Sequence, residues 1–261
     1  MFKDLSCTRY GGEGLVPYEP RSYRNLYTQK DLIHFRVLVE ETDLDIAVRK
    51  ERYNLKLEKL IYSLVQEERE LLKDYIKKDP LFLSSLEPYE PFLDAPHSAF
   101  EMSKAARLAG VGPMAAVAGY FSEIAGKKLA TYSSEVIVEN GGDIWLKLKK
   151  TRLVGIFAGR SPFSNRIALQ INPNLTPLGI CTSSGKVGHS LSFGKADAMV
   201  ILANSATLAD AVATAACNRV KSEQDLEKAV NFALEIPGVI GALCIMGDKM
   251  AAKGNIKIVP I

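Results

Sequence analysis

The sequence predicts an α+β fold built from two similar halves. In each half, a helix rich in small residues precedes a β-hairpin: the helix 114–126 comes before strands at 135–148, and an alanine-rich helix from about Thr207 comes before strands at 241–246 and 255–259. A repeated order of elements is typical of a duplicated fold, in which a ligand cleft lies between the halves. The 261 residues, 47% of them hydrophobic and 24% charged, are enough to bury the core of one large domain.

The first elements are predicted from turn signals and periodicity. Residues 1–30 are rich in Gly, Pro, Tyr and Arg, which predicts an extended arm packed on the body. Alternating β-branched residues predict strands at 35–39 and 42–48. Apolar residues at helical spacing from 57 to 76 predict a long amphipathic helix, which Pro80 ends.

The middle of the chain continues with helices and a hairpin. Residues 80–96 form a connector punctuated by proline, and 99–110 read as a short helix ended by glycine. Pro113 is placed as the first residue of the next helix, which runs to Gly126. The Asn-Gly-Gly sequence at 140–142 suits a tight turn between two strands.

The second half repeats this order. A strand at 167–171 is followed by a loop that begins at Thr182, then by the alanine-rich helix and the final pair of strands. The repeat is weak in sequence, and the prediction of duplication depends on the order of elements.

Composition and charge exclude several classes of protein. The formal net charge is +3, and no run of Lys and Arg is interleaved with aromatic residues, which argues against a nucleic-acid partner. The amino terminus lacks the apolar stretch of a signal peptide, and no segment reaches the ~18 apolar residues of a membrane span. We therefore expect a cytoplasmic protein without a membrane partner, whose four cysteines form no disulfide.

The densest group of reactive side chains is the segment 182–190, which reads Thr-Ser-Ser-Gly-Lys-Val-Gly-His-Ser. Its hydroxyls and small residues let backbone N–H groups approach a phosphate, and His189 is a candidate general acid. Loops of small residues are also ordinary turns between strands, and a lone histidine is usually structural. Both interpretations stay open from the residues alone.

Asp210 and Thr214 are candidate metal ligands. They lie four residues apart on a predicted helix, so their oxygens face the same side, and carboxylate and hydroxyl oxygens are ligands that Mg²⁺ accepts. The alternative is that Thr207 caps this helix, Asp210 is favoured by the helix dipole and Thr214 only packs. Spacing does not decide between the two.

An ordered series of motifs resembles one known family. Asn-Gly-Gly-Asp at 140–143, Thr-Ser-Ser-Gly at 182–185, Gly-His-Ser at 188–190 and Ala-Asp-Ala-x-x-Thr at 209–214 are similar to the motifs of the ApbE family, the magnesium-dependent FAD:protein FMN transferases. Gly119-Tyr120 is similar to that family's Lys-Gly-Tyr segment. The match covers roughly residues 105–258, and the preceding region looks more like a separate branch of the ApbE-like superfamily.

The resemblance implies a T-fold-like, duplicated α+β architecture that binds FAD between its halves with Mg²⁺. It implies metal binding by Asp210 and Thr214 and a catalytic role for His189 near the reacting phosphate. The candidate cofactor-binding residues are Gly119, Tyr120, Asn140, Gly141, Gly142, Thr182, Ser183, Ser184, Gly185, Gly188 and Ser190. We expect a single domain over 1–261, in which 1–98 hold the arm, strands and long helix and 99–261 hold the motifs.

Two departures from the family pattern bear on activity. The lysine before Gly-Tyr is Ala118 here, and the family's Asp-Pro falls on Ser192-Phe193. Loss of a positioned charge can cost roughly 10²–10³ in rate. The expected function is binding of FAD with a divalent metal, with cleavage of the diphosphate to transfer or release FMN. The alternative is a non-catalytic protein that binds flavin or another small metabolite; an acceptor protein and a homo-oligomer stay open.

Overall fold

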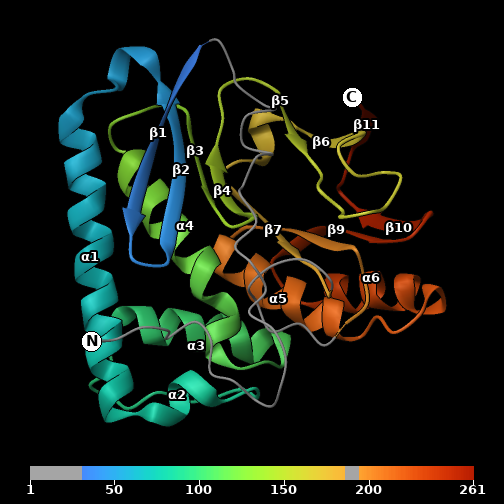
Figure 1. Cartoon of the computed structure of the whole chain (residues 1–261), viewed down its shortest axis with the longest axis horizontal. Coiled ribbons are helices and arrows are strands. Elements are labelled where there is room, and N and C mark those ends of the chain that lie inside the picture. The colour runs from blue at the N-terminus through green and yellow to red at the C-terminus, as the bar shows by residue number, and fades with distance from the viewer. Residues whose placement is uncertain (1–30, 186–193) are drawn as a thin grey trace.

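The computed structural model describes residues 31–185 and 194–261. Its centre is an antiparallel sheet of eight strands in the order β1-β2-β3-β4-β7-β8-β9-β10. Helices cover one face of this sheet, and a three-stranded sheet in the order β11-β6-β5 lies on the other face (Figure 1). The predicted α+β class is confirmed.

The bounds of the strands are β1 Leu32–Val39, β2 Thr42–Arg49, β3 Val136–Asn140, β4 Asp143–Lys147, β5 Arg152–Gly155, β6 Ile167–Ile171, β7 Leu178–Ser183, β8 Ala198–Ala203, β9 Val239–Met246, β10 Lys249–Gly254 and β11 Ile258–Pro260. The helices are α1 Leu55–Lys78, α2 Pro80–Ser84, α3 His97–Ala109, α4 Val117–Leu129, α5 Ala206–Asn218 and α6 Leu226–Glu235. Short 3-10 turns are η2 Lys50–Arg52, η3 Pro113–Ala116, η4 Pro173–Leu175 and η5 Glu223–Asp225.

The main sheet is duplicated in its chain order. In the first half the hairpin β1-β2 is followed by helices and then by the hairpin β3-β4, and in the second half β7-β8 is followed by α5 and α6 and then by β9-β10. The halves join where β4 pairs with β7, with Ile144 opposite Ile180. The predicted repeat of a helix before a hairpin is therefore present in both halves.

The strand predicted at 167–171 is confirmed, but two assignments in the second half were wrong. The strand at 167–171 is β6, which belongs to the smaller sheet and not to the repeat. The partner of β9 is β10 and not 255–259, because Gly247, at a φ of 59°, allows a tight turn directly after Met246. The end of the chain forms β11, which pairs with β6.

The helix 114–126 also differs from its prediction. Pro113 opens η3, and α4 itself begins at Val117 and continues beyond Gly126 to Leu129. Gly126 is not a stop: a Cβ there would lie 2.1 Å from Cε3 of Trp145. The absence of a side chain lets the indole ring of β4 pack directly on the helix, which fixes α4 against the sheet.

The sheet separates two hydrophobic cores. The larger lies between the sheet and the helices and includes Ile46, Val138 and Trp145, and the smaller lies against the three-stranded sheet and includes Leu146 and Leu169. No single helix among the described residues is long and apolar enough to cross a bilayer. By length and composition alone, α3 taken with the η3–α4 segment would suffice, but this pair is bent by 99°.

Candidate functional site

The candidate site lies where the start of α4 meets α5 and the ends of β4 and β7. Oδ2 of Asp210 accepts a hydrogen bond from the backbone N–H of Gly119 at 2.8 Å. A Cβ at Gly119 would lie 2.3 Å from the carbonyl oxygen of Ala206. Glycine at this position therefore permits the two helices to approach closely enough for the contact.

Asp210 does not cap its own helix. The N-cap of α5 is Ser205, whose Oγ accepts from the N–H of Leu208 at 3.3 Å, so the alternative with Thr207 as the cap is wrong. Asp210 is the fifth residue of α5 and instead binds the amino end of α4. Its position is compatible with a ligand role, because each carboxylate oxygen has two lone pairs and can accept from α4 and bind a cation at the same time.

A second carboxylate makes the reverse contact. Oε2 of Glu123, a buried residue of α4, accepts from Ser205 Oγ at 2.7 Å and from both the N–H and Oγ1 of Thr207 at 3.0 Å. Its Oε1 pairs with the exposed Lys127 at 2.6 Å. The starts of α4 and α5 are thus each bound by a carboxylate from the other helix, which complements the partial positive charge of helix N-termini.

Asp143 places another buried carboxylate beside Asp210. Burial is the main cause that raises the pKa of Asp143 well above its usual range, and the negative charge of Asp210 raises it further. Loss of hydration also raises the pKa of Asp210, although hydrogen bonds from the N–H groups of Gly119 and Ala118 counter this. Two carboxylates that repel each other in a site with little water are poised to accept a proton or a cation.

Cys181 completes this group from β7. The buried thiol donates to the carbonyl oxygen of Ala206 at 3.3 Å, and burial together with the charges of Asp143 and Asp210 raises its pKa. A thiol held in its neutral form is a poor nucleophile. Cys181 therefore packs beneath the carboxylates as a small, uncharged residue.

The turn between β3 and β4 contacts the same site. Asn140 donates from Nδ2 to the carbonyl oxygen of Ala118 at 3.1 Å, and the N–H of Gly142 donates to Oε1 of Glu139 at 2.6 Å. Gly142 has a φ of 102°, and its missing Cβ would lie 3.9 Å from the carbonyl oxygen of Thr182. The structure thus brings the Asn-Gly-Gly turn, the start of α4 and Thr182 together.

Two residues of the segment that begins at Thr182 hydrogen-bond to the chain just before β8. The N–H of Gly185 donates to the carbonyl oxygen of Ala196 at 3.0 Å, and Ser184 Oγ donates to the same oxygen at 3.4 Å. Oγ of Ser183, by contrast, is buried and has no hydrogen-bond partner among the residues that the structure describes. A buried hydroxyl without a partner costs free energy unless a ligand or water satisfies it, so Ser183 is the residue of this segment best placed to bind one.

The remaining candidates lie in different places: Tyr120 is directed away from the carboxylate group, Thr214 follows Asp210 on α5, and three residues lie outside the described ranges. The hydroxyl of Tyr120 donates to Oε2 of Glu68 on α1 at 3.0 Å, so the ring points into the helical layer and not toward Asp210. Thr214 lies one helical turn after Asp210 and is buried. His189 lies outside the described residues, as do Gly188 and Ser190.

The donor set fits a hard divalent cation. Asp143 and Asp210 supply carboxylate oxygens, which Mg²⁺ prefers, and a cation would relieve the repulsion between the two carboxylates. Within the described ranges, no three or more His, Cys, Asp or Glu side chains are grouped so that they could hold a metal ion. A cation here would therefore complete its shell with backbone carbonyl, water or ligand oxygens.

Sequence reasoning missed the roles of Asp143 and Glu123. Asp143 stood in the quoted motif, but its closeness to Asp210 depends on the packing of α5 on β4 and β7, which no local pattern shows. Glu123 had one signal: it is the only acid within the predicted helix 114–126, a segment of small and apolar residues. A carboxylate in such a helix needs a partner, since charged groups are rarely buried without one.

Comparisons with known proteins agree with this fold. The model of the family described as AbpE bacteria matches residues 24–251. A UPF0280 protein of Methanocella arvoryzae is 47% identical over 186 residues, which cover 71% of this chain and 76% of that protein. The ApbE protein of Thermotoga maritima has a similar fold, with a TM-score of 0.54 at 15% identity over 85% of this chain and 96% of that one. The flavinyl transferase ApbE of Pseudomonas stutzeri, apo form, has a TM-score of 0.53 at 12% identity, covering 85% and 94%.

Proposed function

The chain belongs to the AbpE bacteria family, and from that premise we propose that it binds FAD together with a divalent metal ion, Mg²⁺, at the site formed by α4, α5 and the ends of β4 and β7. The observation that carries the proposal is the pair Asp143 and Asp210, two carboxylates with raised pKa values beside the start of α4. A diphosphate bound through a metal ion suits such a pair, because the cation neutralises charge on both sides.

The residues of the chain have separate tasks in this proposal. Asp210 and Thr214 hold the metal, with Asp143 close to it, and the unpartnered hydroxyl of Ser183 donates to a phosphate oxygen. The Gly141-Gly142 turn leaves room for the flavin beside Thr182. A divalent ion, when bound, would polarise the phosphoryl oxygens and neutralise charge on them.

We extend the proposal to cleavage of the FAD diphosphate, which transfers or releases FMN, with His189 placed near the reacting phosphate. The flavinyl transferase named among the structural neighbours supports this reaction class by its fold. An acceptor protein for FMN belongs to the same proposal. Positioning and charge neutralisation supply most of the rate in such reactions.

A second candidate function is binding without turnover. Ala118 and Ser192 favour this function, because they stand where the resembled enzymes have charged residues. The residues proposed to bind the metal and the phosphate, by contrast, match the family's motifs. A protein of this kind would carry or sense the flavin.

One experiment separates the two functions. Purified protein is incubated with FAD and Mg²⁺, and FAD, FMN and AMP are separated by chromatography while bound flavin is measured on the same sample. If the wild-type protein forms FMN and AMP and the variants Asp210→Ala and His189→Ala do not, the protein is an enzyme. If it binds FAD without forming these products, it is a carrier. Absence of both binding and products would refute the proposed function.

A further inference from the structure

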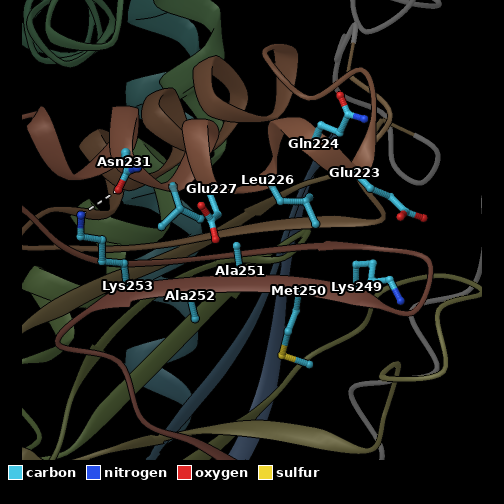
Figure 2. Close-up of a pocket in the computed structure, with 11 residues that line it drawn as sticks. Glu223, Gln224, Leu226, Glu227, Asn231, Lys249, Met250, Ala251, Ala252 and Lys253 are labelled. Carbon is cyan, nitrogen blue, oxygen red and sulfur yellow. Dashed lines mark hydrogen bonds between the residues drawn. The ribbon is translucent and has the colours of Figure 1, made fainter.

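A groove of about 850 Å³ lies away from the candidate site, between α6 and the edge strand β10 (Figure 2). One wall is formed by η5 and α6 and the other by β10. In the sheet register, Ala251 of β10 lies in the same row as Ser183, three strands away. At the usual spacing between strands this is about 14 Å. The groove is therefore separate from the proposed flavin site.

The backbone of β10 has a free edge toward this groove. Among the described strands, β10 is the last in the eight-stranded order and pairs only with β9. The pair Met246 and Lys249 flanks a two-residue turn and is of the hydrogen-bonded type, which recurs at every second residue. The bond from the N–H of Asn255 to the carbonyl oxygen of Ile240, at 2.7 Å, continues this alternation. Met250 and Ala252 thus direct their backbone N–H and C=O groups outward.

The wall formed by η5 and α6 is apolar at the base of the groove and carries acidic side chains above it. Leu226 and Val230 of α6 are buried at the base of the groove. Glu223 and Glu227 are exposed above them, and neither has an ion-pair partner within the part of the chain that the structure describes. The lysines of the strand are already bound: Lys249 pairs with Asp248 at 3.2 Å and Lys253 donates to Asn231 at 2.8 Å. Asn231 is neutral, so Lys253 keeps its positive charge, and the groove holds the two unpaired carboxylates against this one ammonium group. The net charge of the groove is therefore negative.

We propose that this groove binds an extended segment of a partner polypeptide, which adds to β10 as a further strand and directs basic side chains to Glu223 and Glu227. A free strand edge beside a helix supplies main-chain hydrogen bonds, and the side chains of the helix select the sequence. A second copy of β10 is a poor occupant, because antiparallel pairing centred on Ala251 would place Lys249 opposite Lys253.

The proposal is tested with a blocked hexapeptide that alternates valine with lysine, and with a second hexapeptide that has glutamate in place of lysine. Binding to the full chain is followed by NMR titration and by amide hydrogen exchange. We expect saturable binding of the lysine peptide, slower exchange at Met250 and Ala252, and at least about tenfold weaker binding of the glutamate peptide. Equal binding of the two peptides, or binding without protection of β10, would overturn the proposal.

Two variants and a control sharpen the test. Ala252→Pro removes an outward N–H without touching the ladder to β9, and Glu227→Lys reverses the charge of the opposite wall; each should weaken binding about tenfold. Glu235→Lys, also exposed on α6 but outside the groove, should change it less than twofold. Peptide binding that both Ala252→Pro and Glu227→Lys leave intact would contradict the proposal. So would a concentration-dependent dimer that protects the β10 amides in the absence of peptide, because β10 would then be occupied by a second copy. FAD binding, measured in parallel, should be the same in all variants.

Discussion

Glu123 on α4 accepts two hydrogen bonds from Thr207 on α5, one from the backbone N–H and one from the hydroxyl, both at 3.0 Å. In return, Asp210 on α5 accepts the N–H of Gly119 on α4 at 2.8 Å. Each helix thus carries the carboxylate that binds the other's first turn. This reciprocal contact fixes the position of the Asp210 carboxylate, on which the proposed function depends.

Replacement of Glu123 by alanine should destabilise the protein by about 2–3 kcal/mol, because it leaves the hydroxyl of half-buried Ser205 and both donors of buried Thr207 without this acceptor. Urea denaturation measures the change. Glu123→Gln should recover part of the loss, since its amide oxygen still accepts. The exposed Glu67 on α1 is the matched control, and Glu67→Ala should stay within about 0.5 kcal/mol of wild type. Equal stability of the Glu123 and Glu67 alanine variants would contradict the account.

Asp143→Asn should stabilise the protein at pH 8 more than at pH 4. The fold raises the pKa of Asp143 above the ordinary value of 3.8, so its contribution to stability is fully present below that value and is lost as pH rises through the raised pKa. Asparagine does not ionise and avoids this loss. We expect the Tm to rise by roughly 2–4 °C at pH 8, the shift that about 1 kcal/mol produces in a domain of this size.

The same Asp143→Asn variant should bind Mg²⁺ with FAD less well than wild type. Thermal unfolding at the two pH values, followed by a binding titration at pH 8, tests both halves of the prediction. A Tm gain of the same size at pH 4 and pH 8 would show that ionisation of Asp143 is not the cause.

Ser183→Ala should leave stability unchanged or slightly raised, because it removes a buried hydroxyl that has no partner in the described part of the chain. If Ser183 donates to a phosphate, the variant should lose about five- to tenfold in FAD affinity, the worth of one hydrogen bond. Ser103 on α3 is a matched control, since its Oγ is also buried without a partner. Ser103→Ala should have the same small effect on stability as Ser183→Ala and should leave FAD affinity unchanged. An equal loss of FAD affinity in both variants would count against a direct role for Ser183.

No disulfide should form in the native protein. Within residues 31–185 and 194–261, Cys181, Cys217 and Cys244 are buried and form no disulfide, and burial raises the pKa of Cys181 and Cys244, the latter to about 12. Four thiols should titrate under denaturing, non-reducing conditions, Cys7 included, while the three buried ones should react slowly in native protein. A count below four in freshly prepared protein would refute this prediction.

Local patterns predicted the elements whose signals are contained in one segment. Periodicity and stop signals predicted three such parts of the fold: the strand pair β1 and β2, the helix α1, and the helix α3. The stop signal of α3 is Gly110, which adopts a left-handed conformation at the C-cap. β10 was missed because Lys249-Met-Ala-Ala-Lys253 lacks β-branched residues, and its strand form depends on pairing with β9.

The candidate site was predictable only as far as its motifs are continuous. Asp210 was identified from its spacing to Thr214, but its contact with Gly119 joins residues far apart in the chain. The partnership of Asp143 with Asp210 and the capping role of Glu123 likewise require the packing of α4 and α5 on the sheet. Tertiary register of this kind leaves no local pattern in a single sequence.

The central claim, that Asp210 binds a metal ion that holds FAD, is tested most directly by titrating FAD into wild type and Asp210→Asn with and without Mg²⁺. Asparagine can still accept the N–H of Gly119, so stability should change by no more than about 1 kcal/mol. Asp225→Asn, which alters another carboxylate that accepts backbone N–H groups, is the control. We predict that Mg²⁺ tightens FAD binding at least about tenfold in wild type and Asp225→Asn but not in Asp210→Asn. Equal enhancement by Mg²⁺ in Asp210→Asn and wild type would contradict the account.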